Sequence, residues 1–207
     1  MNFIEFKNKF LPLACFTTNQ VYASYPDFNR NNLVHWVRKG YLIRLRQSFY
    51  AFPEYKESKN FTLYFANIIY KPSYISLQTA LSFYGIIPEA VPEITSVTTL
   101  KTKTFSNDFG EYSYKNIKPD LMFGYDLKEM EGGRRIMFAT PEKALADLLY
   151  LYPFYNTERE LEELRLDESY MEDDLNTDRL MEYSYRIGSK ALINRIDIPR
   201  KVYNLKY

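Results

Sequence analysis

The apolar positions at the start of the chain recur with the spacing of a helix. A first helix is indicated by four of them: Phe3, Phe6, Phe10 and Leu13. Pro12 helps to end this helix. Thr17 followed by Gln20 forms the capping-box pattern, which predicts the start of a second helix. Pro26 stops this second helix after about two turns.

A third helix and a hairpin follow this pair. Asn29 is a good N-cap for a helix over 29–40, which ends at a glycine. The period then changes from helical to alternating, which predicts a strand over 41–46, a two-residue connection and a return strand over 49–52. The order helix, short helix, turn, helix and hairpin predicts a winged helix-turn-helix domain over residues 1–56.

The rest of the chain mixes helices and strands. The polar segment 53–60 is a candidate boundary, and it is followed by predicted helices over 61–70, 76–84 and 141–149 and by acidic helices from 157 onward. Strands are predicted over 94–99 and 135–139, and 109–114 is predicted to turn back along the first of them as a hairpin. Residues 57–207 therefore form a second, larger α+β domain with its own core, and the chain as a whole is α+β.

Composition narrows the class of protein. No apolar run approaches the ~20 residues of a membrane span, and the first residues lack the order of a signal peptide. Cys15 is the only cysteine, so no intramolecular disulfide forms, and a buried structural thiol is expected. With His35 as the only histidine, a Cys/His zinc site is excluded. These features predict a cytoplasmic protein with no membrane partner and no cofactor.

Charge is distributed unevenly although the net charge is only +1. Residues 1–56 carry eight Lys or Arg and three acidic residues, and the remainder carries 19 basic and 23 acidic residues. Within the remainder, Glu158 to Asp178 holds ten acidic residues against two arginines. A basic head on an acidic body suits a head that approaches a polyanion.

The third predicted helix has two unlike faces. At about 100° per residue, Leu33, Val34 and Val37 fall on the side expected to pack. The opposite side holds two amides, an imidazole and two cations without an acid: Asn31, Asn32, His35, Arg38 and Lys39. A solvated helix normally mixes charge signs, whereas amides and arginine pair with base edges and lysine suits phosphates.

The first turn and the hairpin add further candidates. Asn29 and Arg30 lie in the turn that enters the major groove first, although Arg30 can instead pair with an acid such as Asp27. Arg44 and Arg46 share one face of the hairpin and suit phosphates or the minor groove. The alternative for the hairpin is a solvated edge strand protected by charge. The candidate residues for binding double-stranded DNA are Asn29, Arg30, Asn31, Asn32, His35, Arg38, Lys39, Arg44 and Arg46.

Several segments together resemble a known family. Four segments are similar to the winged-helix head of the AbiE-type abortive-infection antitoxins: Val21–Ala23, Trp36–Tyr41, Arg44–Arg46 and Tyr50–Phe52. These antitoxins belong to type IV toxin–antitoxin systems. Four further segments are similar to the second domain of that family: Ser73–Leu81, Tyr84–Pro88, Thr95–Thr99 and Ala139–Leu145. The resemblance covers roughly residues 15 to 155. The hairpin tip departs from it, because Gln47-Ser48 stands where relatives often have a glycine.

The resemblance implies two roles. The head would repress the protein's own operon by binding operator repeats. The second domain would counter a nucleotidyltransferase-like toxin encoded beside it, without forming a stable complex with that toxin.

An enzyme and a plain regulator are the alternatives to this interpretation. A nuclease needs clustered carboxylates and a lysine around a metal, and Asp120 near Glu142-Lys143 is the only remote candidate. The acidic run 158–178 fits a solvated helical face better than a cation site. No nucleophile–base pair, glycine-rich phosphate loop or cofactor fingerprint is present, so an enzyme is not expected. A plain regulator with a ligand-sensing or assembly domain and no toxin partner stays open.

Overall fold

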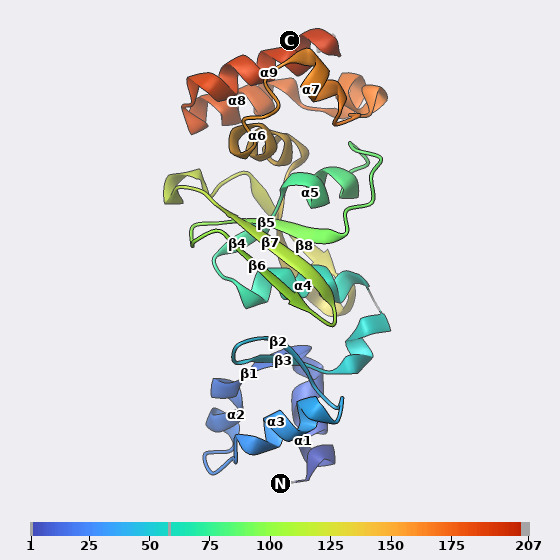
Figure 1. Cartoon of the computed structure of the whole chain (residues 1–207), viewed down its shortest axis with the longest axis vertical. Coiled ribbons are helices and arrows are strands. Elements are labelled where there is room, and N and C mark those ends of the chain that lie inside the picture. Colours follow the sequence, from blue (N-terminus) through green and yellow to red (C-terminus); the bar gives the residue numbers. More distant parts are fainter. Residues whose placement is uncertain (1, 58, 204–207) are drawn as a thin grey trace.

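A computed structural model describes residues 2–57 and 59–203, and it confirms the α+β class expected from the sequence. The elements are stacked along one long axis (Figure 1). The N-terminal elements form one end, a sheet with its helices forms the middle, and the last helices form the other end. We use "head" for the residues up to 56 and "body" for the residues that follow.

The head consists of three helices and a small antiparallel sheet. Its elements are α1 (Phe3–Phe10), η1 (Leu11–Leu13), β1 (Cys15–Thr17), α2 (Thr18–Ser24), α3 (Asn31–Arg38), β2 (Ile43–Arg46) and β3 (Phe49–Ala51). The strand order is β1-β3-β2. The capping box is present, since the Thr17 N–H donates to Gln20 Oε1 over 2.7 Å and the Gln20 N–H donates to Thr17 Oγ1 over 3.3 Å. The three helices and the hairpin were predicted, but β1 was not.

Aromatic side chains fill the core of the head. Phe6 is fully buried, and its ring centroid lies 4.6 Å from that of Phe10 and 4.7 Å from that of Trp36. Phe16, Phe28 and other apolar side chains complete this cluster. Ring burial and ring-to-ring contacts stabilise a small domain that has few aliphatic residues in its core. Many of the head's tyrosines and phenylalanines therefore serve packing.

The body is built on a six-stranded mixed sheet. It is joined to the head by η2 (Pro53–Glu57). Its first elements are α4 (Lys59–Ile69), β4 (Ser73–Ile75), α5 (Leu77–Phe83), β5 (Glu93–Thr98), β6 (Lys103–Asn107), β7 (Gly110–Asn116), η3 (Pro119–Leu121), β8 (Tyr125–Met130), η4 (Glu131–Gly133), β9 (Arg134–Ala139) and α6 (Pro141–Leu151). The strand order is β6-β7-β5-β4-β9-β8. Strands β5 and β7 run parallel, as do β4 and β9, and the other neighbours are antiparallel.

The expected hairpin of 109–114 with the strand at 94–99 is wrong. Strand β7 runs parallel to β5, with Ile94 opposite Tyr112. The antiparallel partner of β7 is β6, which was not predicted and which forms the edge of the sheet directly before β7 in the chain. The turn after Asn107 then returns the chain in the direction of β5. Strands β4 and β8 were also missed, because β4 has only three residues and β8 carries three charged residues among its six.

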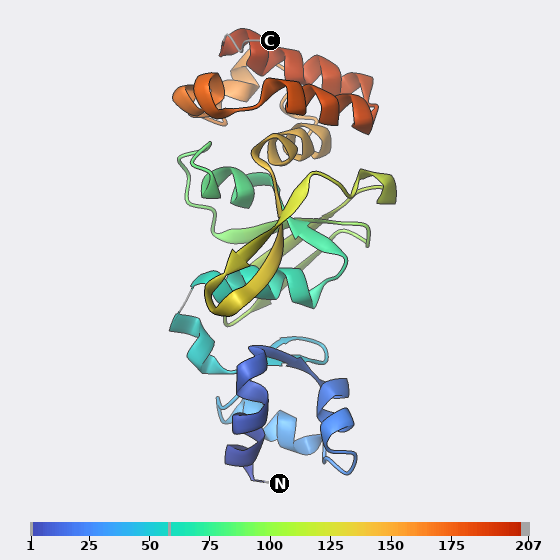
Figure 2. The ribbon, with the colours of Figure 1, turned by 180° about the vertical axis from the view of Figure 1, so that it is seen from behind.

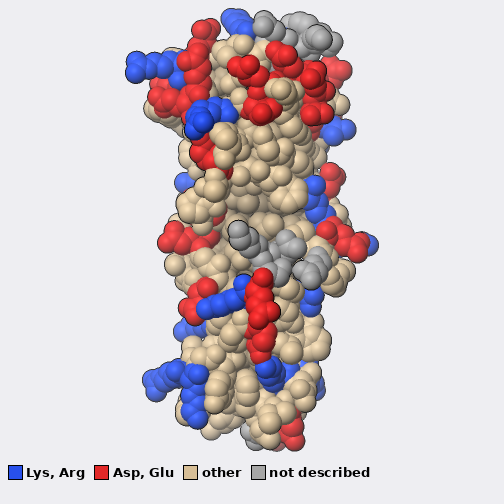
Figure 3. All heavy atoms as spheres, turned by 90° about the vertical axis from the view of Figure 1, so that its right-hand side faces the viewer, with Lys and Arg blue, Asp and Glu red and all other residues tan. Residues whose placement is uncertain are grey.

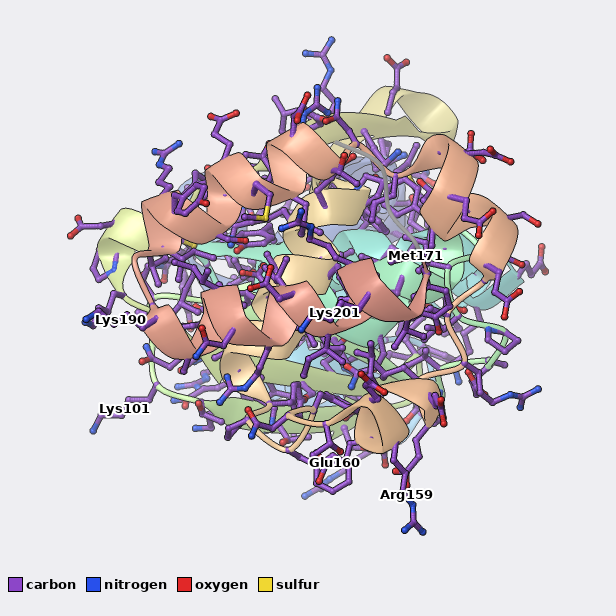
Figure 4. The ribbon with its side chains drawn as sticks, turned by 90° about the horizontal axis from the view of Figure 1, so that it is seen from above. Lys101, Arg159, Glu160, Met171, Lys190 and Lys201 are labelled. Atoms are coloured by element: carbon purple, nitrogen blue, oxygen red, sulfur yellow. The ribbon has the colours of Figure 1, made fainter. Side chains whose placement is uncertain are left out.

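Helices cover both faces of the sheet (Figure 2). Helix α4 lies on the face toward the head, and α5 and α6 lie on the opposite face. Beyond α6 the chain forms α7 (Glu158–Glu162), a π-helical turn η5 (Tyr170–Asp174), α8 (Thr177–Ile187) and α9 (Lys190–Val202). In the view from this end, α8 and α9 lie side by side, while Arg159 and Lys190 point outward at the rim (Figure 4). None of the described helices is long and apolar enough to cross a membrane.

Candidate nucleic-acid interface

Helix α3 starts later and is turned differently than the sequence indicated. Its first residue is Asn31, whose N–H donates to Asn29 Oδ1 over 2.9 Å, so Asn29 caps the helix from just outside it. Leu33 and Trp36 are its buried residues and pack into the aromatic core. Because Trp36 sets the buried side, Val34 lies on the outer side and is 46% exposed. The expectation that Val34 packs against the domain is therefore wrong.

The outer face of α3 consists of Asn31, Val34, His35 and Arg38, all of them exposed. The side chains of Asn31, His35 and Arg38 make no hydrogen bond or ion pair with any described residue. Lys39 follows directly after the helix and is also exposed. The donors of this face thus remain available to a partner, and none of its residues is acidic. We call these five residues the α3 face.

Two further candidates lie beside the α3 face. Asn32 is half-buried and lines a surface hollow of about 390 Å³ at the turn between α2 and α3. Arg30 is exposed and forms no ion pair with Asp27 among the described contacts. The sequence left this pairing open, and the structure leaves the Arg30 guanidinium free to reach outward at the start of the helix.

The position of α3 fits the distribution of charge. It lies at the end of the molecule that is remote from α7, α8 and α9 (Figure 1). On the face seen in Figure 3, acidic side chains gather at the C-terminal end, and several basic side chains lie at the N-terminal end. A polyanion that approaches α3 therefore meets positive charge and stays far from the acidic helices.

Arg44 and Arg46 are separated by the structure. Arg44 is exposed on β2 and makes no ion pair with a described residue. A bulge between the two residues shifts the register, so that Arg44 lies opposite Tyr50 and Arg46 opposite Phe49. Arg46 is half-buried: its Nη1 donates to the carbonyl oxygen of Ile69 over 2.5 Å. This corrects the expectation of a free face that carries both arginines.

The hairpin is held by the body instead of projecting from the head. Asn107 Nδ2 donates to the carbonyl oxygen of Leu45 over 3.0 Å, and Arg134 Nη2 donates to that of Pro12 over 2.8 Å. Five buried head residues belong to the main core of the body: Ala14, Cys15, Ile43, Leu45 and Ala51. The head therefore has its own aromatic core on one side of its sheet and shares the core of the body on the other. Arg44 is the only one of the two hairpin arginines left on the surface.

A charged cluster lies at the centre of the body. Lys143 and Asp147, one turn apart on α6, form an ion pair with side chains 0% and 1% exposed. The hydroxyls of Tyr74 and Ser76 each donate to Asp147 Oδ2 over 2.8 Å, and Lys143 Nζ donates to Tyr74 Oη over 2.9 Å. Gly124, at a φ of +72°, permits this packing, because a Cβ there would lie 2.9 Å from the Lys143 side chain.

This cluster joins two of the motifs that carry the family resemblance. Tyr74 and Ser76 come from one of them, and Lys143 comes from the other. All of these side chains are buried, so they hold β4 against α6 and are closed to a substrate. Spacing alone indicated only that Glu142-Lys143 was a remote enzyme candidate, and nothing in the sequence pairs Lys143 with Tyr74.

The other carboxylates of the enzyme alternative do not assemble. Asp120 is exposed, whereas Glu142 is 3% exposed and accepts the Asn176 N–H over 3.3 Å at the start of α8. Within residues 2–57 and 59–203 no three His, Cys, Asp or Glu side chains are grouped so that they could hold a metal ion. The acidic residues of the C-terminal helices therefore form no cation site in the described part of the chain.

Comparison with known proteins adds no identity. No model of a known protein family matches the chain, and a search of curated proteins finds no match. The resemblance to the AbiE-type antitoxins thus rests on the motifs themselves.

Proposed function

We propose that this protein is a DNA-binding transcriptional regulator whose head is a winged helix-turn-helix. The succession of α2, a short turn and α3, followed by the β2–β3 hairpin, supports this assignment. A third strand that pairs with the hairpin in the order β1-β3-β2 also agrees with a winged domain. In this proposal α3 is the recognition helix.

The observation that carries the proposal is the α3 face. Its amide and guanidinium donors are unpaired in the described structure, and no acid lies among them. An asparagine pairs well with adenine, an arginine with guanine, and an apolar side chain with the methyl group of thymine. Asn31, Arg38 and Val34 supply one of each on the same side of one helix.

Phosphate contacts have their own candidates. Lys39 follows the C-terminal end of α3, and Arg30 and Arg44 are exposed cations on the same domain. Such residues fix the position of a protein on the duplex without reading its sequence. We assign His35 to the α3 face as well, where either ring nitrogen can contact a base or a phosphate. Arg46 is left out, because the body already binds its guanidinium.

Selection from a random pool of duplexes tests the proposal. The full chain is incubated with the pool at moderate salt, and bound DNA is recovered and amplified over several rounds. A regulator that reads bases through α3 enriches a short motif, duplicated if the protein binds as a symmetric pair. Recovery of random sequence after repeated rounds would contradict sequence-specific recognition.

We propose in addition that the regulator is an autorepressing antitoxin. The motifs shared with the AbiE-type antitoxins support this role, and a nucleotidyltransferase-like reading frame beside the gene would support it further. The alternative is a plain regulator with a ligand-sensing or assembly domain. Both proposals place the protein in the cytoplasm, where operator DNA is found.

A further inference from the structure

A pocket of about 420 Å³ lies where the head meets the body. The head contributes residues of β1, α2, β2 and β3, and the body contributes residues of α4 and the loop that follows it. This volume falls in the range of small-molecule sites.

The pocket holds positive charge without a counter-ion. Arg46 and Lys71 line it, and none of its lining residues is acidic. Neither cation forms an ion pair with a described residue. Of the five N–H donors of Arg46, one is used by the carbonyl oxygen of Ile69. Its guanidinium carbon lies 4.9 Å from the ring centroids of both Tyr70 and Phe105, which fixes it beside the pocket.

Arg46 is a half-buried cation without a counter-charge among the described residues, which is an unusual arrangement. Charges removed from water are normally paired, because desolvation costs several kcal/mol that only a counter-charge or a set of hydrogen bonds offsets. The Cys15 thiol does not supply that counter-charge, since burial raises its pKa to about 12 and keeps it neutral. The pocket is therefore prepared for an anion from outside.

The remaining walls indicate what the anion carries. Phe49 and Tyr64 bring two rings to the pocket, and Ile68 and Ile69 bring aliphatic surface. Gln20 adds an amide at the start of α2. Its oxygen and the Thr17 hydroxyl are used by the capping box, which leaves the Nε2 donors of Gln20 for a ligand. Rings pack favourably on flat partners, and a few polar groups on an otherwise apolar wall orient a ligand.

We infer that this pocket binds a small organic anion that carries an aromatic or heteroaromatic ring. Arg46 and Lys71 hold its carboxylate or phosphate group, and the rings of Phe49 and Tyr64 pack on its flat part. A nucleoside monophosphate and an aryl carboxylate both have this chemistry.

Such a ligand contacts both parts of the protein. A molecule that touches α2 and β2 on one side and α4 on the other stabilises one arrangement of head and body. It therefore changes the affinity of any partner that favours a particular arrangement. The ligand site itself does not depend on DNA binding; only its effect on DNA affinity rests on the function proposed above.

The test uses the full chain and isothermal calorimetry without DNA. The probes are the four ribonucleoside 5′-monophosphates and a set of aryl carboxylates, with neutral nucleosides and inorganic phosphate as comparison compounds. The variant is Lys71→Gln, which removes one exposed cation of the pocket. Its matched control is Lys101→Gln, because the Lys101 side chain points away from the molecule (Figure 4).

We expect one of the two ring-bearing classes to bind, and Lys71→Gln to weaken this binding about tenfold or more, as for the loss of a charged hydrogen-bond partner. Lys71→Arg should retain it, and Lys101→Gln should leave it unchanged. Absence of binding by both classes would overturn the inference, and so would an equal affinity of Lys71→Gln and wild type. Equal binding of inorganic phosphate would overturn the requirement for a ring.

The effect on DNA is measured afterwards with the bound compound. Its saturating addition should shift the affinity of wild-type protein for the selected duplex, and leave that of Lys71→Gln unchanged. If the ligand binds but the protein binds no DNA, the proposed function fails and the ligand site stands. If the protein binds DNA but none of the probe compounds, the inference about the pocket fails and the proposed function stands.

Discussion

Replacing Asp147 with asparagine should remove much of the stability of the body. The carboxylate accepts hydrogen bonds from Lys143, from Tyr74 and from Ser76, and all four side chains are at most 1% exposed. An amide of the same shape has one accepting oxygen and two N–H donors. Lys143 would then remain buried as a cation with no counter-charge.

The magnitude follows from this arrangement. Breaking a buried pair by removing one partner costs about 3–5 kcal/mol, out of a total stability of about 5–15 kcal/mol for a native domain. In Asp147→Asn, the Tyr74 oxygen would face both the ammonium of Lys143 and the new amide. Because donors then exceed acceptors, we place the cost within this range and not near the value for a neutral hydrogen bond, about 1 kcal/mol.

Urea unfolding of the full chain, followed by far-ultraviolet circular dichroism, measures the loss. The matched control is Glu89→Gln, which removes the acid of an exposed ion pair with Arg165, with side chains 47% and 69% exposed and 3.1 Å between N and O. That pair should contribute less than about 1 kcal/mol. The double variant Lys143→Met with Asp147→Asn removes both charges, so it should be more stable than Asp147→Asn alone. If Asp147→Asn loses no more than Glu89→Gln, the cluster does not hold the body together.

Three other outcomes are expected. Burial raises the pKa of Tyr74, Tyr112 and Tyr114 above the ordinary 10.0. Above about pH 10 the unfolded chain therefore binds fewer protons than the folded one, and the free energy of unfolding should fall as the pH rises. A constant unfolding midpoint up to pH 12 would contradict this. Arg44→Ala should weaken binding to all duplexes and reduce the salt dependence by about one phosphate contact, whereas Arg46→Ala should lower the melting temperature. If both variants changed DNA affinity equally and neither changed the melting temperature, the different roles given to Arg44 and Arg46 would be wrong. If the protein is an antitoxin that also acts without DNA, co-expression of the adjacent toxin with the variant carrying Arg38→Ala and Arg44→Ala should restore growth, and rescue only by DNA-binding variants would reduce it to a repressor of toxin synthesis.

Local sequence signals predicted the elements that depend on local chemistry. The capping box at Thr17 and Gln20 and the Thr140-Pro141 helix start both lie where spacing placed them. The helix and hairpin order of the head also follows the change of period near Gly40. Such signals act within a few residues of one another, so a single sequence is enough to recognise them.

Features that depend on distant contacts could not be read in this way. Trp36 turns α3 because its ring packs on Phe3 and Phe6 of α1, and this exposes Val34. Arg46 leaves the surface because the body presents the Ile69 carbonyl to it. The helical period assigned Val34 to the core, and the charge pattern assigned Arg46 to DNA. Neither pattern says which distant element packs against the residue, and that element decides its position. The parallel pairing of β5 with β7 was missed for the same reason.

The proposed interaction of the α3 face with duplex DNA is tested most directly by the affinity of the full chain for a labelled duplex across a salt series. The duplex carries the selected sequence, a scrambled duplex is the reference, and the proteins are wild type, Arg38→Ala and Arg159→Ala. Arg159 points outward at the opposite end of the molecule from α3 (Figure 4). Its loss changes the net charge by the same amount as the loss of Arg38, but away from the α3 face. We predict that Arg38→Ala loses about 1–3 kcal/mol of binding to the selected duplex while Arg159→Ala behaves as wild type. Equal affinities of the two variants, or no preference of wild type for the selected duplex, would contradict recognition through α3.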